Sequence, residues 1–195
     1  MIANSIVIPA LAMAERDRHT GQLDHRREDF ILQSINEFVT ELSEAEVIPV
    51  AERSLRSTRV FCFPAHGAAD EIAAAMCAHF LTQEGFPAIT FPVTDSPGQL
   101  LQALGVQAED IVCISAVPPF SAGHARKLVK DIRESGSKVT IVARLWGYSA
   151  SKEGPGAVRL ARLQKAMSGE IAASFGEALE LAKAVGDKAP HVTAG

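Results

Sequence analysis

The chain has 195 residues, enough for one domain of average size with an appendage. Hydrophobic residues make up 47% of it and charged residues 22%, which is typical of a folded globular protein and argues against disorder. The formal net charge of −4 offers no electrostatic attraction to a phosphate backbone, so nucleic acid is not expected as a partner.

The cysteines and the apolar segments indicate the compartment. Cys62, Cys77 and Cys113 are odd in number, widely spaced and embedded in apolar stretches, which favours buried thiols in a reducing environment. The apolar segment 2–13 lacks the basic region of a signal peptide. No apolar run reaches the roughly 20 residues of a membrane span. We therefore expect a cytoplasmic chain.

Residues 1–43 are predicted to form a helical hairpin, like a cap. A first helix over 2–18 ends before Gly21, and Asp24 is placed to cap a second helix through about Leu42. The second helix carries an apolar stripe, formed by Ile31, Ile35, Phe38 and Leu42. Two helices cannot bury this stripe alone, so the pair must pack on something else, and an exposed stripe would invite a partner or a homodimer. Residues 44–58 read as a linker.

Residues 59–186 alternate between short apolar runs and helical segments. The predicted strands are 60–63, 88–91, 111–114, 139–142 and 171–174. The predicted helices are 70–84, 96–104, 121–135, 158–167 and 176–185, and residues 187–195 form a flexible tail. Glycines 85, 105 and 136 follow three of these helices. This alternation predicts an α/β fold with a doubly wound, five-stranded parallel sheet of flavodoxin-like type, in the order 2-1-3-4-5 by analogy.

Ligands of open parallel sheets bind beyond the carboxyl ends of the strands, where the strand order reverses. The residues expected there follow the first, third and fourth strands: His66, Gly67, Asp70, Ser115, Pro118, Phe120, Arg144 and Trp146. The only Trp and the only Tyr of the chain, Trp146 and Tyr148, fall in the last of these loops. An aromatic residue at this place either binds a flat ligand or closes the end of the sheet.

The polar residues of this predicted crevice do not encode a reaction. A histidine in a loop such as that of His66 more often bonds the backbone than it binds a metal or acts as a base. Asp70 and Glu71 are explained by the helix dipole, and Ser115 lacks the context of a nucleophile elbow. Dinucleotide and P-loop fingerprints are missing. We therefore predict a protein that is not an enzyme; an enzyme using His66, Asp70 and Arg144 is the least supported alternative.

The loops resemble those of the cobalamin-binding module, in which a helical cap accompanies a flavodoxin-like domain. That family has Asp-x-His-x-x-Gly after strand one, where this chain has Pro64-Ala65-His66-Gly67-Ala68-Ala69. The resemblance puts His66 at the cobalt-ligand position, with Pro64 in place of the aspartate that orients the imidazole. Ser115-Ala116-Val117 resembles the family's Ser-x-Leu, and Ala143-Arg144 replaces its Gly-Gly. Cobalamin, with His66 as its metal ligand, is the cofactor that this resemblance implies.

A second resemblance covers nearly the whole chain. The chain is similar to the cytoplasmic tail of some permease-type transporters of the autoinducer-2 exporter family. The similar segments are Pro9–Arg18 with Gly21, Pro64–Ala75, Ile114–Phe120 with His124-Ala125-Arg126, and Leu145-Trp146-Gly147. This resemblance implies a regulatory or interaction role at the inner face of the membrane, with a membrane transporter segment or another protein as partner. It also implies that the chain is either a fragment of such a protein or a stand-alone relative.

Overall fold

A computed structural model describes residues 6–45, 56–119, 121–146, 170–172 and 175–186. The strands are β1 (Val60–Pro64), β2 (Ala88–Thr90), β3 (Ile111–Ala116), β4 (Thr140–Leu145) and β5 (Glu170–Ala172). The helices are α1 (Ile8–His19), α2 (His25–Ala45), α3 (Ala68–Gln83), α4 (Pro97–Ala103), α5 (Ser121–Glu134) and α7 (Phe175–Gly186). The helix predicted over 158–167 lies outside the described residues.

The strands form a parallel sheet in the order β2-β1-β3-β4, and the short β5 pairs with β4 through three residues. The predicted α/β class and the order of the first four strands are confirmed. Positive φ angles at Gly21, Gly85, Gly105 and Gly136 agree with their predicted places after helices.

Two of the strands run further than their apolar runs predict. β3 continues through Ser115 and Ala116, and β4 continues through Arg144 and Leu145, because the ladder between them persists to the pair Ala116 and Leu145. Ser115 and Arg144, predicted in loops past the strand ends, are therefore strand residues. A polar side chain interrupts each apolar run, but it does not interrupt the backbone pairing.

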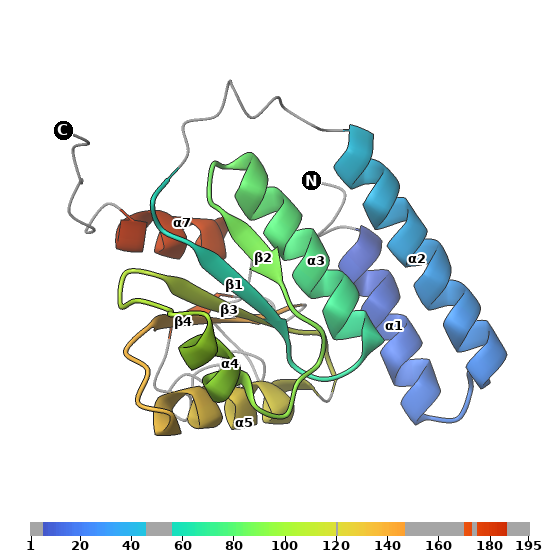
Figure 1. Cartoon of the computed structure of the whole chain (residues 1–195). Helices are drawn as coiled ribbons and strands as arrows, with labels where there is room; N and C mark the ends of the chain where they lie inside the picture. The colour runs from blue at the N-terminus through green and yellow to red at the C-terminus, as the bar shows by residue number, and fades with distance from the viewer. Residues whose placement is uncertain (1–5, 46–55, 120, 147–169, 173–174, 187–195) are drawn as a thin grey trace, which may run out of the picture.

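Helices cover both faces of the sheet, as a doubly wound arrangement requires. In Figure 1, α3 and α7 lie on one side of the sheet, and α4 and α5 lie on the other. Each face has its own apolar core. Alternate residues of β1 show the division, because Cys62 faces the core of the α3 side while Phe61 and Phe63 face the core of the α5 side.

The helices α1 and α2 pack outside α3 (Figure 1). Leu11 of α1 and Val39 of α2 belong to the core of the α3 side, and Leu32 and Ile35 pack against it. The stripe of α2 that packs on this core is thus Val39, which is buried, with Leu32 and Ile35, which are partly buried. Of the predicted stripe, Ile35 packs on this core as expected, but Phe38 is exposed.

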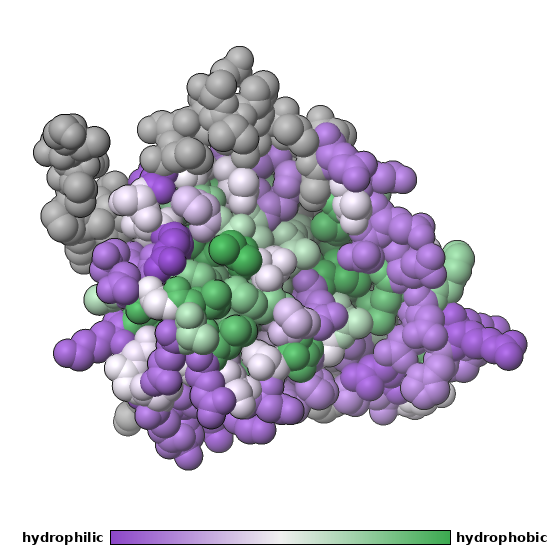
Figure 2. All heavy atoms as spheres, in the orientation of Figure 1, coloured by the Kyte–Doolittle hydropathy of each residue, from purple (hydrophilic) through white to green (hydrophobic). Residues whose placement is uncertain are grey.

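The most extensive apolar surface of the view in Figure 2 lies over β2 and its neighbours. Ile89 of β2, Val93 of the following segment and Leu104 after α4 are each between 40% and 50% exposed. We call these three residues the β2 patch. Among the described residues β2 is the outermost strand on its side of the sheet, so the patch borders a strand edge that none of them pairs with. In the part of the chain described, no helix has the length and hydropathy needed to span a bilayer.

A buried carboxylate joins β1 to β3 at the amino ends of the strands. Asp110, 2% exposed, accepts hydrogen bonds from the Arg59 guanidinium, with Nε at 3.1 Å from its Oδ1. The backbone N–H of Gln107 donates to its Oδ2 at 2.8 Å. One side chain therefore ties the start of β1 to the turn that precedes β3.

Replacing Asp110 with alanine is expected to lower the free energy of unfolding by about 2–4 kcal/mol, because the Gln107 N–H loses its acceptor and the Arg59 guanidinium keeps only its bond to the Gly105 carbonyl. Urea denaturation followed by far-UV circular dichroism measures this loss. Glu109→Ala, at the exposed neighbouring position, is the matched control and is expected to change stability by less than about 0.5 kcal/mol. Equal effects of the two substitutions would contradict the structural role of Asp110.

Candidate functional site

The carboxyl ends of β1, β3 and β4 lie side by side, as predicted for a crevice at this edge. Pro64 pairs with Ser115, and Ser115 pairs with Arg144. The Ala65 N–H donates to the Ser115 carbonyl at 2.8 Å, and the Trp146 N–H donates to the Ala116 carbonyl at 2.9 Å. The backbone therefore brings together the three loops that carry the predicted site residues.

The side chains of these residues divide between the two faces of the sheet. His66 is exposed and lies on the α5 side, where its imidazole stacks on that of His124 with a centroid separation of 3.9 Å and an interplanar angle of 8°. Ser115, Arg144 and Trp146 are buried in the α3 side. Gly67 precedes α3 as its N-cap, Pro118 forms a cis peptide bond with Pro119, and Phe120 lies outside the described residues.

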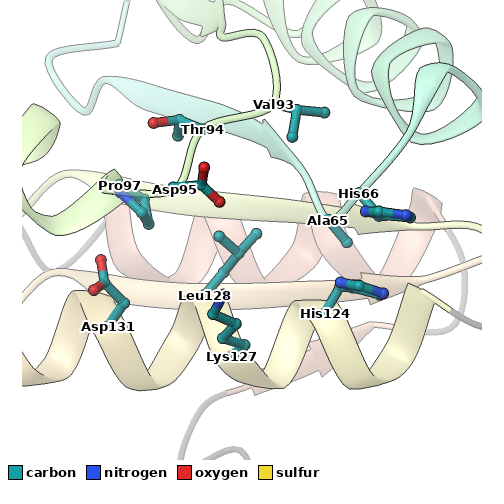
Figure 3. A pocket seen from close by; sticks show the side chains of 10 residues that line it. All are labelled: Ala65, His66, Val93, Thr94, Asp95, Pro97, His124, Lys127, Leu128 and Asp131. Carbon is teal, nitrogen blue, oxygen red and sulfur yellow. The ribbon is translucent and has the colours of Figure 1, made fainter.

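A small pocket of about 60 Å³ opens beside the stacked histidines. Figure 3 shows the side chains that line it, which come from the loop after β1, the segment after β2, the start of α4, and α5: Ala65, His66, Val93, Thr94, Asp95, Pro97, His124, Lys127, Leu128 and Asp131. Burial lowers the pKa of His124, and the charges of His66 and Lys127 act in the same direction. The volume suits a few waters and is far below the roughly 300–1,000 Å³ of sites for drug-sized ligands.

A layer of polar groups lies buried between the sheet and α3. Asp70, at the start of α3, is 1% exposed, and its Oδ1 accepts a hydrogen bond of 2.6 Å from the Val117 N–H. Its Oδ2 has no hydrogen-bond partner in the described part of the protein. Burial is the largest cause that raises the pKa of Asp70 to about 7, and the Val117 hydrogen bond opposes it. This carboxylate therefore holds the loop after β3 through the Val117 N–H.

Arg144 and Trp146 occupy alternate positions along the end of β4, so both point into the α3 side. The Arg144 guanidinium lies 3.5 Å from the centroid of the Trp146 ring, a close cation–π contact. Their side chains are 0% and 2% exposed. Of the two predicted roles of Trp146, closing the end of the sheet agrees with this burial, and display at a pocket mouth does not.

The three cysteines form a cluster that sequence reasoning missed. Their sulfur atoms all lie within 4.8 Å of one another, and the Sγ atoms of Cys77 and Cys113 are 3.6 Å apart. Hydrogen bonding by the other two thiols lowers the pKa of Cys77, and the Arg144 charge adds to this effect against burial. Hydrogen bonding to Cys113 and to Cys77 raises the pKa of Cys62. The three thiols therefore interact directly with one another inside the core.

A signal for this cluster was present in the sequence. Cys62 and Cys113 sit in the middle of neighbouring strands at matched register positions, and the two-residue alternation puts them on the same face. Cys77 lies on the inward face of the helix that directly follows β1, among the buried residues Ala73, Ala74 and Leu81. The spacing of the three cysteines along the chain does not show that they meet, because their proximity depends on the order of the strands in the sheet.

Comparison with protein-family models finds no family that matches the chain. Comparison with curated proteins finds no similar sequence.

Proposed function

We propose that the chain is a non-catalytic regulatory or interaction module with a flavodoxin-like fold, acting with a bacterial membrane transporter. The observation that carries this proposal is the burial of the polar residues at the carboxyl edge of the sheet. Asp70, Ser115, Arg144 and Trp146 are all at most 2% exposed, and Asp70 bonds to backbone. An acid, base or nucleophile must reach its substrate, and these four side chains are buried in the interior of the protein.

The surface supports a binding role. The β2 patch joins exposed apolar side chains to an unpaired strand edge, a combination that serves in recognition of extended segments. Its occupant in this proposal is a segment of the transporter, following the resemblance of the chain to transporter tails. The location that this implies is the cytoplasmic face of the membrane.

Sedimentation with membrane vesicles from the organism that encodes the chain tests this proposal. The purified chain is expected to sediment with native vesicles and to remain in solution with protein-free liposomes of the same lipids. The double variant Ile89→Ser, Leu104→Ser is expected to lose at least about tenfold in affinity, since each truncation removes apolar contact area. The matched control is Met13→Ser, Phe30→Ser, which removes side chains of α1 and α2 that are 60% or more exposed.

Equal sedimentation of the two double variants would contradict docking through the β2 patch. Absence of the wild-type chain from the vesicle pellet would contradict the transporter association itself. Both variants must keep the far-UV spectrum of the wild type for the comparison to count.

Cobalamin binding is the second candidate, and the exposure of His66 at the end of β1 favours it. The nearby pocket of about 60 Å³ would have to open widely to admit a corrinoid. Hydroxocobalamin mixed with the protein would change its visible spectrum if an imidazole replaced its axial ligand. A spectral change that disappears in His66→Ala, but not in His124→Ala, would support the cobalamin sensor over the module without a cofactor.

A further inference from the structure

The thiol cluster is assembled from three separate elements on the α3 side of the sheet. Cys62 and Cys113 are register partners in β1 and β3, and Cys77 reaches them from α3. All three side chains are at most 2% exposed, and all three are free thiols. Among the described residues, this trio is the one group of His, Cys, Asp or Glu side chains whose ligand atoms lie close enough together to hold an ion.

The sulfur separations fit one shared ion. Three thiolates that each lie about 2.3 Å from a central metal are roughly 4 Å apart from one another. The observed limit of 4.8 Å and the Cys77–Cys113 distance of 3.6 Å bracket that value. Small side-chain rotations would therefore bring the three sulfur atoms to coordination distance.

The local charge also favours bound thiolates. Arg144 is fully buried on the same side of the sheet, and this burial lowers the pKa of its guanidinium, while the nearby cysteine sulfur atoms oppose that effect. A buried guanidinium requires nearby negative charge, because desolvation of an isolated cation is costly. A thiolate-bound ion would supply negative charge beside it.

We propose that Cys62, Cys77 and Cys113 bind one monovalent copper ion in a three-sulfur site. Soft thiolate ligands select Cu(I) or zinc among common ions. Structural zinc takes four ligands, whereas these residues offer three, inside an apolar core. On binding, the thiols release their protons to solvent, and the copper keeps its oxidation state. The ion would connect β1, β3 and α3 beneath the carboxyl edge of the sheet. Binding of this ion would be a second property of the chain, in addition to the proposed interaction role.

An anaerobic titration of the reduced protein with Cu(I), buffered by the chelator bicinchoninate, tests this site. We expect one Cu(I) per chain, near-ultraviolet absorption from sulfur-to-copper charge transfer, and a Tm rise of about 5–10 °C when free Cu(I) is about 100 times Kd. Each of Cys62→Ala, Cys77→Ala and Cys113→Ala is expected to weaken Cu(I) binding by more than about 100-fold. Loss of a residue that only hydrogen-bonds to a metal ligand typically weakens binding 10- to 100-fold. Met76→Leu, which alters a buried sulfur residue outside the cluster, should bind Cu(I) like the wild type.

X-ray absorption of the copper-loaded wild type gives a second measurement that does not depend on variants that fold. Three sulfur neighbours at about 2.3 Å would support the site. Nitrogen or oxygen neighbours, Cu(I) binding that survives all three cysteine substitutions, or failure to compete with bicinchoninate would overturn it. Retention of Zn(II) in preference to Cu(I) in a parallel titration would also overturn the choice of ion.

Discussion

Replacing Trp146 with alanine is expected to lower the free energy of unfolding by about 3–5 kcal/mol, the range found when large aromatic side chains are removed from cores. The indole is 2% exposed and belongs to the core of the α3 side. The substitution also removes the ring that the Arg144 guanidinium covers at 3.5 Å, which leaves a buried cation with one contact fewer. Urea denaturation at pH 7, followed by far-UV circular dichroism, measures the change.

Two controls separate packing from other causes. Trp146→Phe retains an aromatic face for Arg144 and should cost clearly less than Trp146→Ala. Phe30→Ala removes an aromatic side chain that is 71% exposed, and it should change stability by less than about 0.5 kcal/mol. A loss of under about 1 kcal/mol for Trp146→Ala would mean that the indole does not close the end of the sheet.

Asp70→Asn is expected to stabilise the protein at pH 8 by roughly 2–4 kcal/mol and to change stability little at pH 4. The folded-state pKa of Asp70 is raised to about 7, above the value of 3.8 for an unperturbed aspartate. Between these two values the folded protein holds a proton that the unfolded chain has released, so stability from this group falls as the pH rises from 4 to 7. The side-chain oxygen of asparagine still accepts the hydrogen bond from the Val117 N–H. The asparagine side chain is neutral, so the variant has no buried charge at this position at pH 8.

The measurement is a series of urea denaturation curves from pH 4 to pH 8 for the wild type and for Asp70→Asn. Glu71→Gln is the matched control, because it neutralises the adjacent, half-buried carboxylate of the same helical turn. We expect the difference between wild type and Asp70→Asn to grow with pH, and the control to follow the wild type. If Asp70→Asn were less stable than the wild type at pH 8, the ionised carboxylate would be favourable in the folded protein, which would contradict this prediction.

The parallel sheet was predictable because its strands are continuous apolar runs separated by helices. Buried runs such as Ile111–Ile114 and glycines such as Gly85 after a helix are local signals, and the strand order followed from analogy with similar folds. The ends of β3 and β4 were not predictable from apolar character, since Ser115 and Arg144 continue the ladder as buried polar residues. Backbone pairing decides where a strand ends, and side-chain polarity is only an indirect sign of it.

The candidate site was predictable in position but not in detail. Strand order alone placed His66, Ser115 and Trp146 at one edge of the sheet. Which face each side chain takes depends on the exact register and on where the strand stops, because a shift of one residue reverses the face. The phase of α2 shows the same limit: its apolar residues allow two neighbouring stripes, and packing on α3 selects Leu32, Ile35 and Val39.

The fluorescence of Trp146 tests most directly whether the carboxyl edge of the sheet is closed, on which the non-catalytic proposal depends. The chain contains a single tryptophan, so its emission reports this site alone. A closed edge predicts that Trp146 emits at a shorter wavelength than indole in water and that acrylamide and iodide quench it weakly. In urea, the emission wavelength and the quenching should become those of a solvent-exposed tryptophan. Solvent-like emission and ready quenching in the native protein would contradict it, and would instead indicate an open crevice at the ends of β1, β3 and β4.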